Sequence, residues 1–184
     1  MGKIIAAMNI TLDGFCDHTA MIADEEIHQH YSDLINDAGI LLYGRITYQL
    51  MESYWPMVVK NPTGNKAMDE FAVAIDNASK IVFSRTLNHV DWKNTILKNE
   101  IVTKEIAALK QQTDKDILVG SPGLIAAFTQ LGLIDEYQLA VQPTILGSGL
   151  QLFKNISDKV DLKLLKTKTF GCGAIILYHE LAKK

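Results

Sequence analysis

Short apolar segments alternate with amphipathic segments over the first two thirds of the chain. The apolar segments show no polar–apolar alternation, which is typical of buried strands, and they lie at residues 3–10, 40–43, 80–84 and 116–120, with a short addition at 95–97. Between them, apolar residues recur at helical spacing, as in Ile27, Tyr31, Leu34 and Ile35. This spacing predicts helices over residues 24–37, 66–78, 102–111 and 121–131, and a turn entering a helix at 44–51. The alternation of strands and helices predicts a mostly parallel sheet built from βαβ units.

Local signals mark several ends of these elements. Asp24, Glu25 and Glu26 begin the first helix, where the helix dipole favours negative charge, and Gly39 is a plausible stop after it. Residues 53–65 contain Pro56, Pro62 and Gly64 and are predicted to form a loop.

The last third of the chain has a different pattern. Residues 133–146 form a longer run in which polar and apolar positions alternate. Two further β-type runs, 162–170 and 172–181, are separated by Gly171 alone and predict a hairpin. The sheet should therefore end in an antiparallel edge. No repeat or linker divides the chain, so we expect one α/β domain over residues 1–184.

Composition narrows the class of protein. The chain of 184 residues is 48% hydrophobic and carries a net charge of −3, with no long basic run that would indicate a nucleic-acid partner. The sequence contains no run of about 18 consecutive apolar residues, so no membrane-spanning helix is predicted. Two cysteines, Cys16 and Cys172, are too few for a disulfide scaffold and favour free thiols in a reducing cytoplasm.

Three predicted strands end in small or basic residues, at Gly44-Arg45-Ile46-Thr47, at Ser84-Arg85 and at Gly120-Ser121-Pro122-Gly123. In open α/β sheets, ligands gather beyond the carboxyl ends of the strands. Helix N-termini bind phosphate, and arginine adds forked donors that suit it. Ordinary strand-to-helix turns and a phosphate-binding edge both remain open interpretations of these three stretches.

The titratable residues are less informative. Asp13 lies in the turn after the first strand, where it either begins an Asp-Gly turn or acts on a ligand. The histidines are scattered or, as His28 and His30, two residues apart on a predicted helix, so no metal site is expected. The sequence contains neither a phosphate-binding GxxxxGK[ST] loop nor a GxGxxG fingerprint.

Taken in order, these segments resemble the dihydrofolate reductase-like family. The resemblance rests on "NITLDGF", "LLYGRITYQLM", "IVFSRTL" with Trp92, Asn94 and Thr95 after it, and "DILVGSPGLIAAFTQLGLIDEYQLAVQPTILGSGLQLF". The last block resembles the C-terminal reductase domain of the bifunctional riboflavin-biosynthesis deaminase-reductase. It implies a dihydrofolate reductase-like three-layer fold with a mostly parallel eight-stranded sheet and an antiparallel C-terminal hairpin.

The resemblance also implies NADPH as the hydride donor. By position, Gly44, Arg45 and Thr47 would hold cofactor phosphates, and Ser84 and Arg85 would lie near the adenosine 2′-phosphate. Gly120, Ser121, Gly123 and Leu124 would cradle the pyrophosphate, and Ala7 and Met8 would meet the nicotinamide through backbone groups. Asp13 and Gly14 would belong to the loop over nicotinamide and substrate, opposite Gly147 and Gly149.

We therefore expect a cytoplasmic NADPH-dependent reductase of a small pteridine- or ribosylaminopyrimidine-like heterocycle. Asp13 would orient the substrate or supply a proton, which needs a pKa raised by burial, and water is the alternative donor. Tyr54 and Trp55 would stack on a flat substrate or simply pack.

The sequence shows no H-x-E…P-C-x-x-C deaminase signature, so a stand-alone reductase form is expected. A non-catalytic nucleotide-binding or sensory protein is the alternative. Relatives of this fold imply a homodimer.

Overall fold

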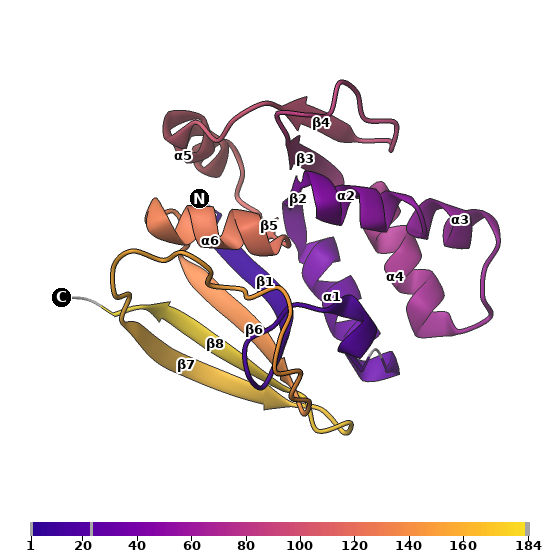
Figure 1. Ribbon diagram of the computed structural model, residues 1–184. Helices are drawn as coiled ribbons and strands as arrows, with labels where there is room; N and C mark the ends of the chain where they lie inside the picture. Colours follow the sequence, from indigo (N-terminus) through magenta and orange to yellow (C-terminus); the bar gives the residue numbers. More distant parts are fainter. Residues whose placement is uncertain (1, 23, 183–184) are drawn as a thin grey trace. The chain divides into compact units, whose positions relative to one another are not determined.

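Eight strands form one sheet in the computed structural model, which describes residues 2–22 and 24–182. Their order is β4-β3-β2-β5-β1-β6-β8-β7 (Figure 1). The strands are β1 (Ile4–Thr11), β2 (Ala38–Gly44), β3 (Ser79–Phe83), β4 (Thr95–Lys98), β5 (Asp116–Val119), β6 (Glu136–Gln142), β7 (Leu162–Thr169) and β8 (Ile175–Leu181). The helices are the 3₁₀ turn η1 (His18–Ala20) and α1 (Glu25–Asp37), α2 (Arg45–Glu52), α3 (Trp55–Lys60), α4 (Lys66–Asn77), α5 (Thr103–Gln112) and α6 (Pro122–Gln130).

Two compact units make up the chain. The first holds residue 2 and residues 24–118, and the second holds residues 3–22 and 119–182. The expectation of a single domain over residues 1–184 stays a prediction.

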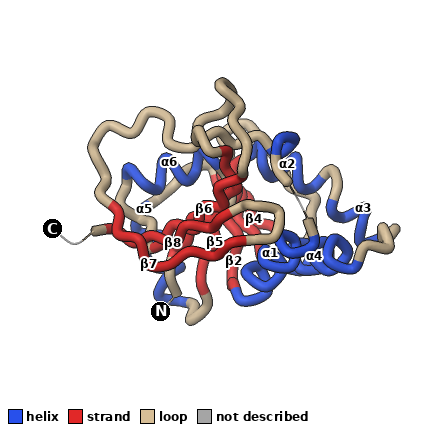
Figure 2. Tube along the Cα trace, turned by 90° about the horizontal axis from the view of Figure 1, so that it is seen from below, coloured by secondary structure: helices blue, strands red, loops and turns tan. Residues whose placement is uncertain are grey.

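Parallel pairing organises the first unit. β2 pairs with β3, and β3 pairs with β4, both in parallel. α1 and α4 lie side by side, and α3 lies against α4 (Figures 1 and 2). The apolar stripe of α1 buries Ile27 and Ile35, as its spacing predicted. The Asp24 side chain caps α1 by accepting a hydrogen bond from the Ile27 N–H at 2.9 Å, which satisfies an otherwise unpaired donor of the first turn.

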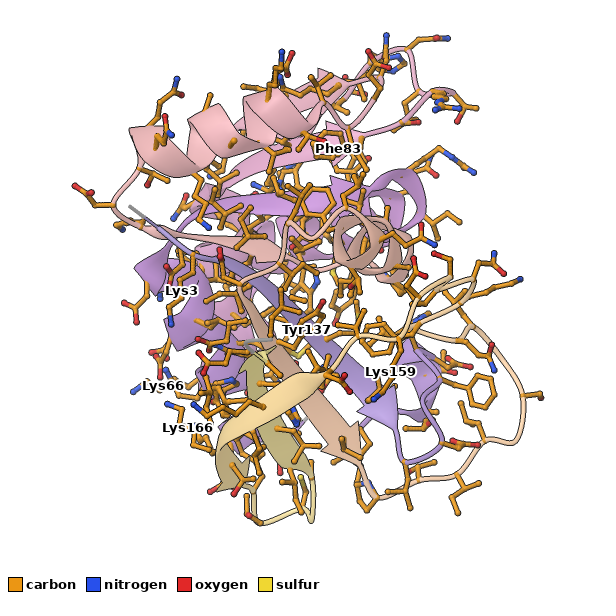
Figure 3. The ribbon with its side chains drawn as sticks, turned by 90° about the vertical axis from the view of Figure 1, so that its left-hand side faces the viewer. Lys3, Lys66, Phe83, Tyr137, Lys159 and Lys166 are labelled. Atoms are coloured by element: carbon orange, nitrogen blue, oxygen red, sulfur yellow. The ribbon has the colours of Figure 1, made fainter. Side chains whose placement is uncertain are left out.

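The second unit combines a parallel pair with an antiparallel end. β1 pairs with β6 in parallel, while β8 runs antiparallel to both β6 and β7. α6 buries Leu124, Ile125 and Phe128. Tyr137 on β6, labelled in Figure 3, donates a hydrogen bond to the Thr129 hydroxyl of α6 at 3.0 Å, so helix and strand are joined by a buried polar contact. The predicted eight-stranded, mostly parallel sheet with an antiparallel C-terminal hairpin is confirmed.

Three local predictions were wrong. Residues 53–65 are not all loop, because α3 occupies Trp55–Lys60 with Pro56 in its first turn, where the missing N–H has no helical partner to lose. Gly39 does not end α1, since Ala38 already takes an extended conformation (ψ 153°) and enters β2. β6 stops at Gln142 rather than continuing to residue 146, because Pro143 has no N–H for the sheet ladder.

Cys16 and Cys172 are free, as predicted. Burial raises the pKa of the Cys16 thiol to about 12. Within residues 2–22 and 24–182, no helix has both the length and the apolar character needed to cross a bilayer.

Candidate functional site

Two of the three predicted strand-end motifs come together in the first unit. Gly44, the last residue of β2, is in register with Phe83, the last residue of β3. Arg45 then begins α2, and Arg85 follows β3 with one residue between. Because β2 and β3 are parallel neighbours, both motifs lie at the same edge of the sheet, as the sequence predicted.

This edge carries concentrated positive charge. Arg45 and Arg85 are the only two arginines in the sequence, and both side chains are exposed. Arg45 Nη1 donates to Gln49 Oε1 at 3.2 Å. A guanidinium group has five N–H donors, so this hydrogen bond uses only one of them. The first turn of α2 contains no acidic side chain, so the positive end of its dipole is not neutralised locally. Such an edge suits a phosphate group, and Thr47 in the same turn is partly exposed.

The Ser84 hydroxyl forms hydrogen bonds within its own loop. Its side chain is 8% exposed, and its hydroxyl accepts hydrogen bonds from the Thr86 N–H at 3.1 Å and the Leu87 N–H at 3.0 Å. These bonds fold residues 84–87 into a tight turn. Ser84 therefore shapes the loop that presents Arg85.

The predicted aromatic pair begins α3 instead of lying in a loop. Trp55 contacts Phe71, with ring centroids 4.6 Å apart, and its indole N–H points at Met51 Sδ at 3.1 Å. Tyr54 packs edge-on against Trp55 at 5.0 Å and stays 39% exposed. Packing accounts for the position of Trp55, while Tyr54 keeps a ring surface that could meet a ligand.

A buried polar network in the first unit escaped the sequence analysis. The Trp92 indole donates to Asp76 Oδ1 at 2.7 Å, and its backbone N–H donates to the Tyr48 hydroxyl at 3.1 Å. Lys80, only 1% exposed, lies with its ammonium 4.3 Å from the Trp92 ring centroid. Burial lowers the pKa of Lys80 to about 8. A lysine before an apolar run looked like a strand start, and nothing local signalled its burial.

In the second unit, Asp13 ties two distant loops together. Its carboxylate accepts hydrogen bonds from the Thr11 hydroxyl at 2.6 Å, the Gly147 N–H at 2.7 Å and the Leu146 N–H at 3.2 Å. Gly14 follows with φ +86°, which a residue with a side chain rarely adopts. The Asp-Gly turn of the sequence analysis is therefore present, and it is also a clamp on residues 146–147.

These hydrogen bonds set the protonation state of Asp13. The Thr11 hydroxyl is the largest cause that lowers the pKa of the carboxyl below its ordinary 3.8, and the Gly147 and Leu146 N–H groups act in the same direction. The raised pKa that a proton donor requires is not found. Asp13 is positioned as an ionised orienting group.

Gly147 and Gly149 lie against the same turn. Both have positive φ, at 75° and 138°, and a Cβ on Gly149 would come within 3.6 Å of the Phe15 ring. Further backbone bonds join the segments, from the Cys16 N–H to the Leu150 carbonyl at 2.7 Å and from the Leu152 N–H to the Gly14 carbonyl at 3.1 Å. The structure thus joins residues 11–16 to residues 146–152, and the role of Asp13, Gly14, Gly147 and Gly149 around nicotinamide and substrate stays a prediction.

The third strand-end motif leads into α6. Ser121 is the N-cap residue, Pro122 occupies the first turn, and Leu124 is buried. A Cβ on Gly123 would meet no atom within 4 Å, so the backbone here is open to a close approach. Gly123 borders a hollow of about 300 Å³ whose wall also includes residues 150–152, Lys154 and Asn155.

Amide side chains also lie on β1 and β6, and the sequence analysis did not assign them a role. Asn9 lies in the predicted apolar segment of residues 3–10, and Gln138 and Gln142 lie in the predicted alternating run of residues 133–146. Asn9 lies one residue beyond the predicted nicotinamide neighbours, Ala7 and Met8, on the same strand. Gln142 is fully buried, and Gln138 is 7% exposed. Polar side chains buried in a strand would have been the available signal.

No group of three or more histidine, cysteine or acidic side chains that could hold a metal ion occurs among the described residues.

Comparison with known proteins identifies a family model and a relative that match nearly the whole chain. The family model of the RibD C-terminal domain matches residues 2–176. YyaP, an uncharacterized protein of Bacillus subtilis (strain 168), is 35% identical over 182 residues, which cover 96% of this chain and 94% of YyaP.

Solved structures share the fold. A putative riboflavin biosynthesis protein from Shewanella sp. PV-4 has a TM-score of 0.75 at 17% identity, covering 98% of this chain and 99% of that one. Dihydrofolate reductase from Enterococcus faecalis, complexed with NADP(H), has a TM-score of 0.64 at 12% identity, covering 99% and 98%.

Proposed function

The chain belongs to the RibD C-terminal domain family, and from this membership we propose that it is an NADPH-dependent reductase of a small heterocyclic substrate. The family and the dihydrofolate reductase-like fold indicate an oxidoreductase domain. The proposed substrate is a pteridine- or ribosylaminopyrimidine-like compound, and the proposed reaction is of the 5-amino-6-(5-phosphoribosylamino)uracil reductase type.

One observation carries the cofactor proposal. The only two arginines of the sequence stand at neighbouring carboxyl ends of parallel strands, one of them on the first turn of a helix without acidic residues. NADPH carries a pyrophosphate and a 2′-phosphate, and guanidinium groups bind phosphate oxygens with paired N–H donors. Arg45 and Thr47 would bind cofactor phosphate here, and Arg85 would bind the 2′-phosphate.

The second unit has features of its own that suit a phosphate-bearing ligand. The open backbone at Gly123 and the positive end of α6 suit the close approach of a pyrophosphate. Residues 11–16 and 146–152, joined through Asp13, form a preorganised pair of loops. When bound, NADPH supplies a hydride from nicotinamide C4. The residues of this chain bind the phosphates, orient the ring and orient the substrate.

The proton for the reduced product comes from water in this proposal. Asp13 accepts three hydrogen bonds that lower its pKa, so it is ionised near neutral pH and has no proton to give. Its charge remains available to orient a substrate N–H group or a water molecule.

Titration of the cofactor tests the proposal. Arg45→Ala and Arg85→Ala should each raise the Kd for NADPH roughly tenfold or more, because each loses charge-assisted hydrogen bonds to phosphate. Arg85→Ala should affect NADPH more than NADH, which lacks the 2′-phosphate. Lys66→Ala removes an exposed charge on α4 and serves as the control. Unchanged NADPH affinity in both arginine variants would sink the cofactor assignment.

Turnover separates the enzyme from the alternative, a non-catalytic nucleotide-binding or sensory protein. NADPH oxidation is followed with pterin, dihydrofolate and ribosylaminopyrimidine substrates. Tight NADPH binding without oxidation by any of these compounds would favour the binding protein. The homodimer also stays a prediction, and light scattering coupled to gel filtration would contradict it by giving the mass of one chain.

A further inference from the structure

One face of the sheet in the second unit carries a set of amide side chains. On β1 and β6, Ala7 is in register with Gln138, Asn9 with Ala140 and Thr11 with Gln142. Paired residues of neighbouring strands lie on the same face, and so do residues two apart along one strand. Asn9, Gln138 and Gln142 therefore share one face, and Ala7 and Ala140 between them have the smallest side chains of the group.

Hydrogen bonds fix which end of the Asn9 amide faces outward. Gln142 Oε1 accepts a hydrogen bond from the Ile22 N–H at 3.4 Å, so the Gln142 NH₂ group is turned the other way and donates to Asn9 Oδ1 at 3.1 Å. Reversing the Gln142 amide would set one donor against another at Ile22. Asn9 therefore uses its oxygen on Gln142, and its NH₂ group remains as the donor end of the amide.

Gln138 presents the opposite polarity. Its NH₂ group donates to Glu136 Oε1 at 2.8 Å, and Glu136 Oε2 is paired with Lys3 at 2.8 Å. Reversing the Gln138 amide would set its oxygen against a carboxylate, so the orientation is fixed. Among the residues that the structure describes, none donates a hydrogen bond to Gln138 Oε1, which is buried in a residue that is only 7% exposed. A buried acceptor without a partner is costly, and its retention needs an explanation.

The two amides are spaced for one small group. Gln138 is opposite Ala7, two residues before Asn9. With about 6.6 Å between alternate residues of a strand and about 4.8 Å between strands, the Cα atoms of Asn9 and Gln138 lie roughly 8 Å apart. A planar –CO–NH– group with a hydrogen bond of about 2.9 Å at either end can bridge side chains at that spacing.

From this arrangement we propose that Asn9 and Gln138 recognise the lactam edge (–CO–NH–) of a heterocyclic substrate. The Asn9 NH₂ group donates to the ring carbonyl oxygen, and the ring N–H donates to Gln138 Oε1. Gln142 and Glu136 act as positioning residues that hold the two amides in the required orientation. The proposal rests on the reductase function proposed above and narrows its substrate class to rings with an unsubstituted lactam.

The opposite face of the same strands has no comparable pair. Tyr137, which points to that face, uses its hydroxyl on Thr129. On the amide face, Tyr178 of β8 is in register with Gln138, and the Lys166 ammonium lies 4.5 Å from the centroid of the Tyr178 ring. Lys166 is labelled in Figure 3. This aromatic and cationic pair lies next to the proposed lactam site, and neither of its members donates a hydrogen bond to Gln138 Oε1.

Calorimetric titration with two probes tests the pairing. The first probe is 5,6-diaminouracil, and the second is 5,6-diamino-1,3-dimethyluracil, in which no ring N–H remains. We expect the full-length protein, saturated with NADP⁺, to bind the first probe roughly ten- to a hundredfold more tightly, because the methylated ring leaves the Gln138 oxygen unpaired. In Gln138→Leu this preference should fall to near unity.

A second variant keeps the test valid if Gln138→Leu folds poorly. Asn9→Asp preserves shape and still accepts from Gln142, but it presents an oxygen to the ring carbonyl, so binding of 5,6-diaminouracil should weaken about tenfold or more. Gln111→Leu, on an exposed position of α5, is the matched control and should keep the wild-type preference. Circular dichroism melting checks the fold of each variant.

The outcomes separate this inference from the proposed function. Equal affinity for the two uracils, no binding of either, or an unchanged preference in Gln138→Leu would each overturn the lactam assignment. NADPH oxidation with other substrates would then still support the reductase. If NADP⁺ fails to quench tryptophan fluorescence while the uracil preference and its loss in Gln138→Leu persist without cofactor, the cofactor proposal fails and the lactam site stands.

Discussion

Replacing Lys80 by methionine tests whether a charged ammonium group is buried at the start of β3. The ammonium donates to the backbone carbonyls of Ala78 at 2.7 Å, Asp76 at 3.2 Å and Lys93 at 3.4 Å, and it lies over the Trp92 ring. Burial is the largest influence on its pKa and lowers it from 10.5 to about 8, against the attraction of Asp76. Methionine has similar length and no charge, so the exchange removes the titration with little change in volume.

The sign of the effect follows from proton binding. Between pH 8 and pH 10.5 the unfolded chain binds a proton at Lys80 that the folded chain has released, so the free energy of unfolding rises with pH in this window. Below pH 8 both states hold the proton, and the contribution is constant. Each pKa unit corresponds to about 1.36 kcal/mol, so the rise between pH 7 and pH 10 is at most about 2.5 kcal/mol. That is a large fraction of the stability of a typical domain.

Urea denaturation of both proteins at pH 7, 8, 9 and 10 measures the effect. Subtracting the variant cancels other groups that titrate at high pH, including Tyr48, whose pKa burial raises to about 12. We expect the wild-type stability, relative to Lys80→Met, to rise by about 2 kcal/mol across this range. Lys66→Met, at an exposed lysine labelled in Figure 3, should show no such slope. A difference that stays constant from pH 7 to pH 10 would refute the buried ammonium group.

Three further predictions follow from single contacts. Tyr137→Phe and Thr129→Val, measured singly and together by urea denaturation, should show a coupling of about 1 kcal/mol for their buried 3.0 Å hydrogen bond, and additive losses would contradict it. Gly132→Ala should lower the free energy of unfolding by about 1 kcal/mol, because Gly132 has φ +64°. Gly123→Ala should not lower the Tm, because the new Cβ would have no atom within 4 Å. Equal effects of the two substitutions would refute the backbone argument. Asp13→Asn should speed amide hydrogen exchange at Gly147 and reduce the loss of stability in acid. The wild-type carboxylate contributes stability above its ordinary pKa of 3.8 and loses that contribution as the pH falls through the lowered pKa of the folded state. Identical exchange rates and identical acid denaturation profiles in both proteins would rule out the clamp.

The sequence predicted the parts of the fold that depend on local pattern. The amphipathic run and its acidic start predicted α1, with Glu25 and Glu26 in the first turn. Asp24 was predicted in that turn as well, whereas in the structure it precedes the turn and caps the helix. The hairpin of β7 and β8 follows from two β-type runs separated by a glycine. Pro56 misled the prediction because proline breaks a helix interior but is accepted in a first turn, and the sequence does not distinguish the two.

The parts that could not be predicted depend on residues far apart in the chain. Asp13 meets Gly147 across a sequence separation of 134 residues, so an Asp-Gly turn gives no sign that its carboxylate accepts a hydrogen bond from Gly147. Lys80 is buried because Asp76, Trp92 and Lys93 close around it, while its own neighbours indicate only a strand. The polarity of Asn9 is set by Gln142 at a separation of 133 residues. Strand-end glycines and arginines were predictable because parallel topology itself brings them to one edge.

The protonation states in the second unit limit how the proposed reduction can proceed. Asp13 is an ionised acceptor, and the Cys16 thiol, with a pKa of about 12, stays protonated and unreactive near neutral pH. Neither group is poised to transfer a proton at that pH, which is why the proposed reduction takes its proton from water and assigns binding and orientation to the chain. Rate and specificity then depend on how well the substrate ring is held against the nicotinamide. Two fixed amides of opposite polarity can hold it in one orientation, because the reversed ring would set its carbonyl against Gln138 Oε1 and its N–H against the Asn9 NH₂ group.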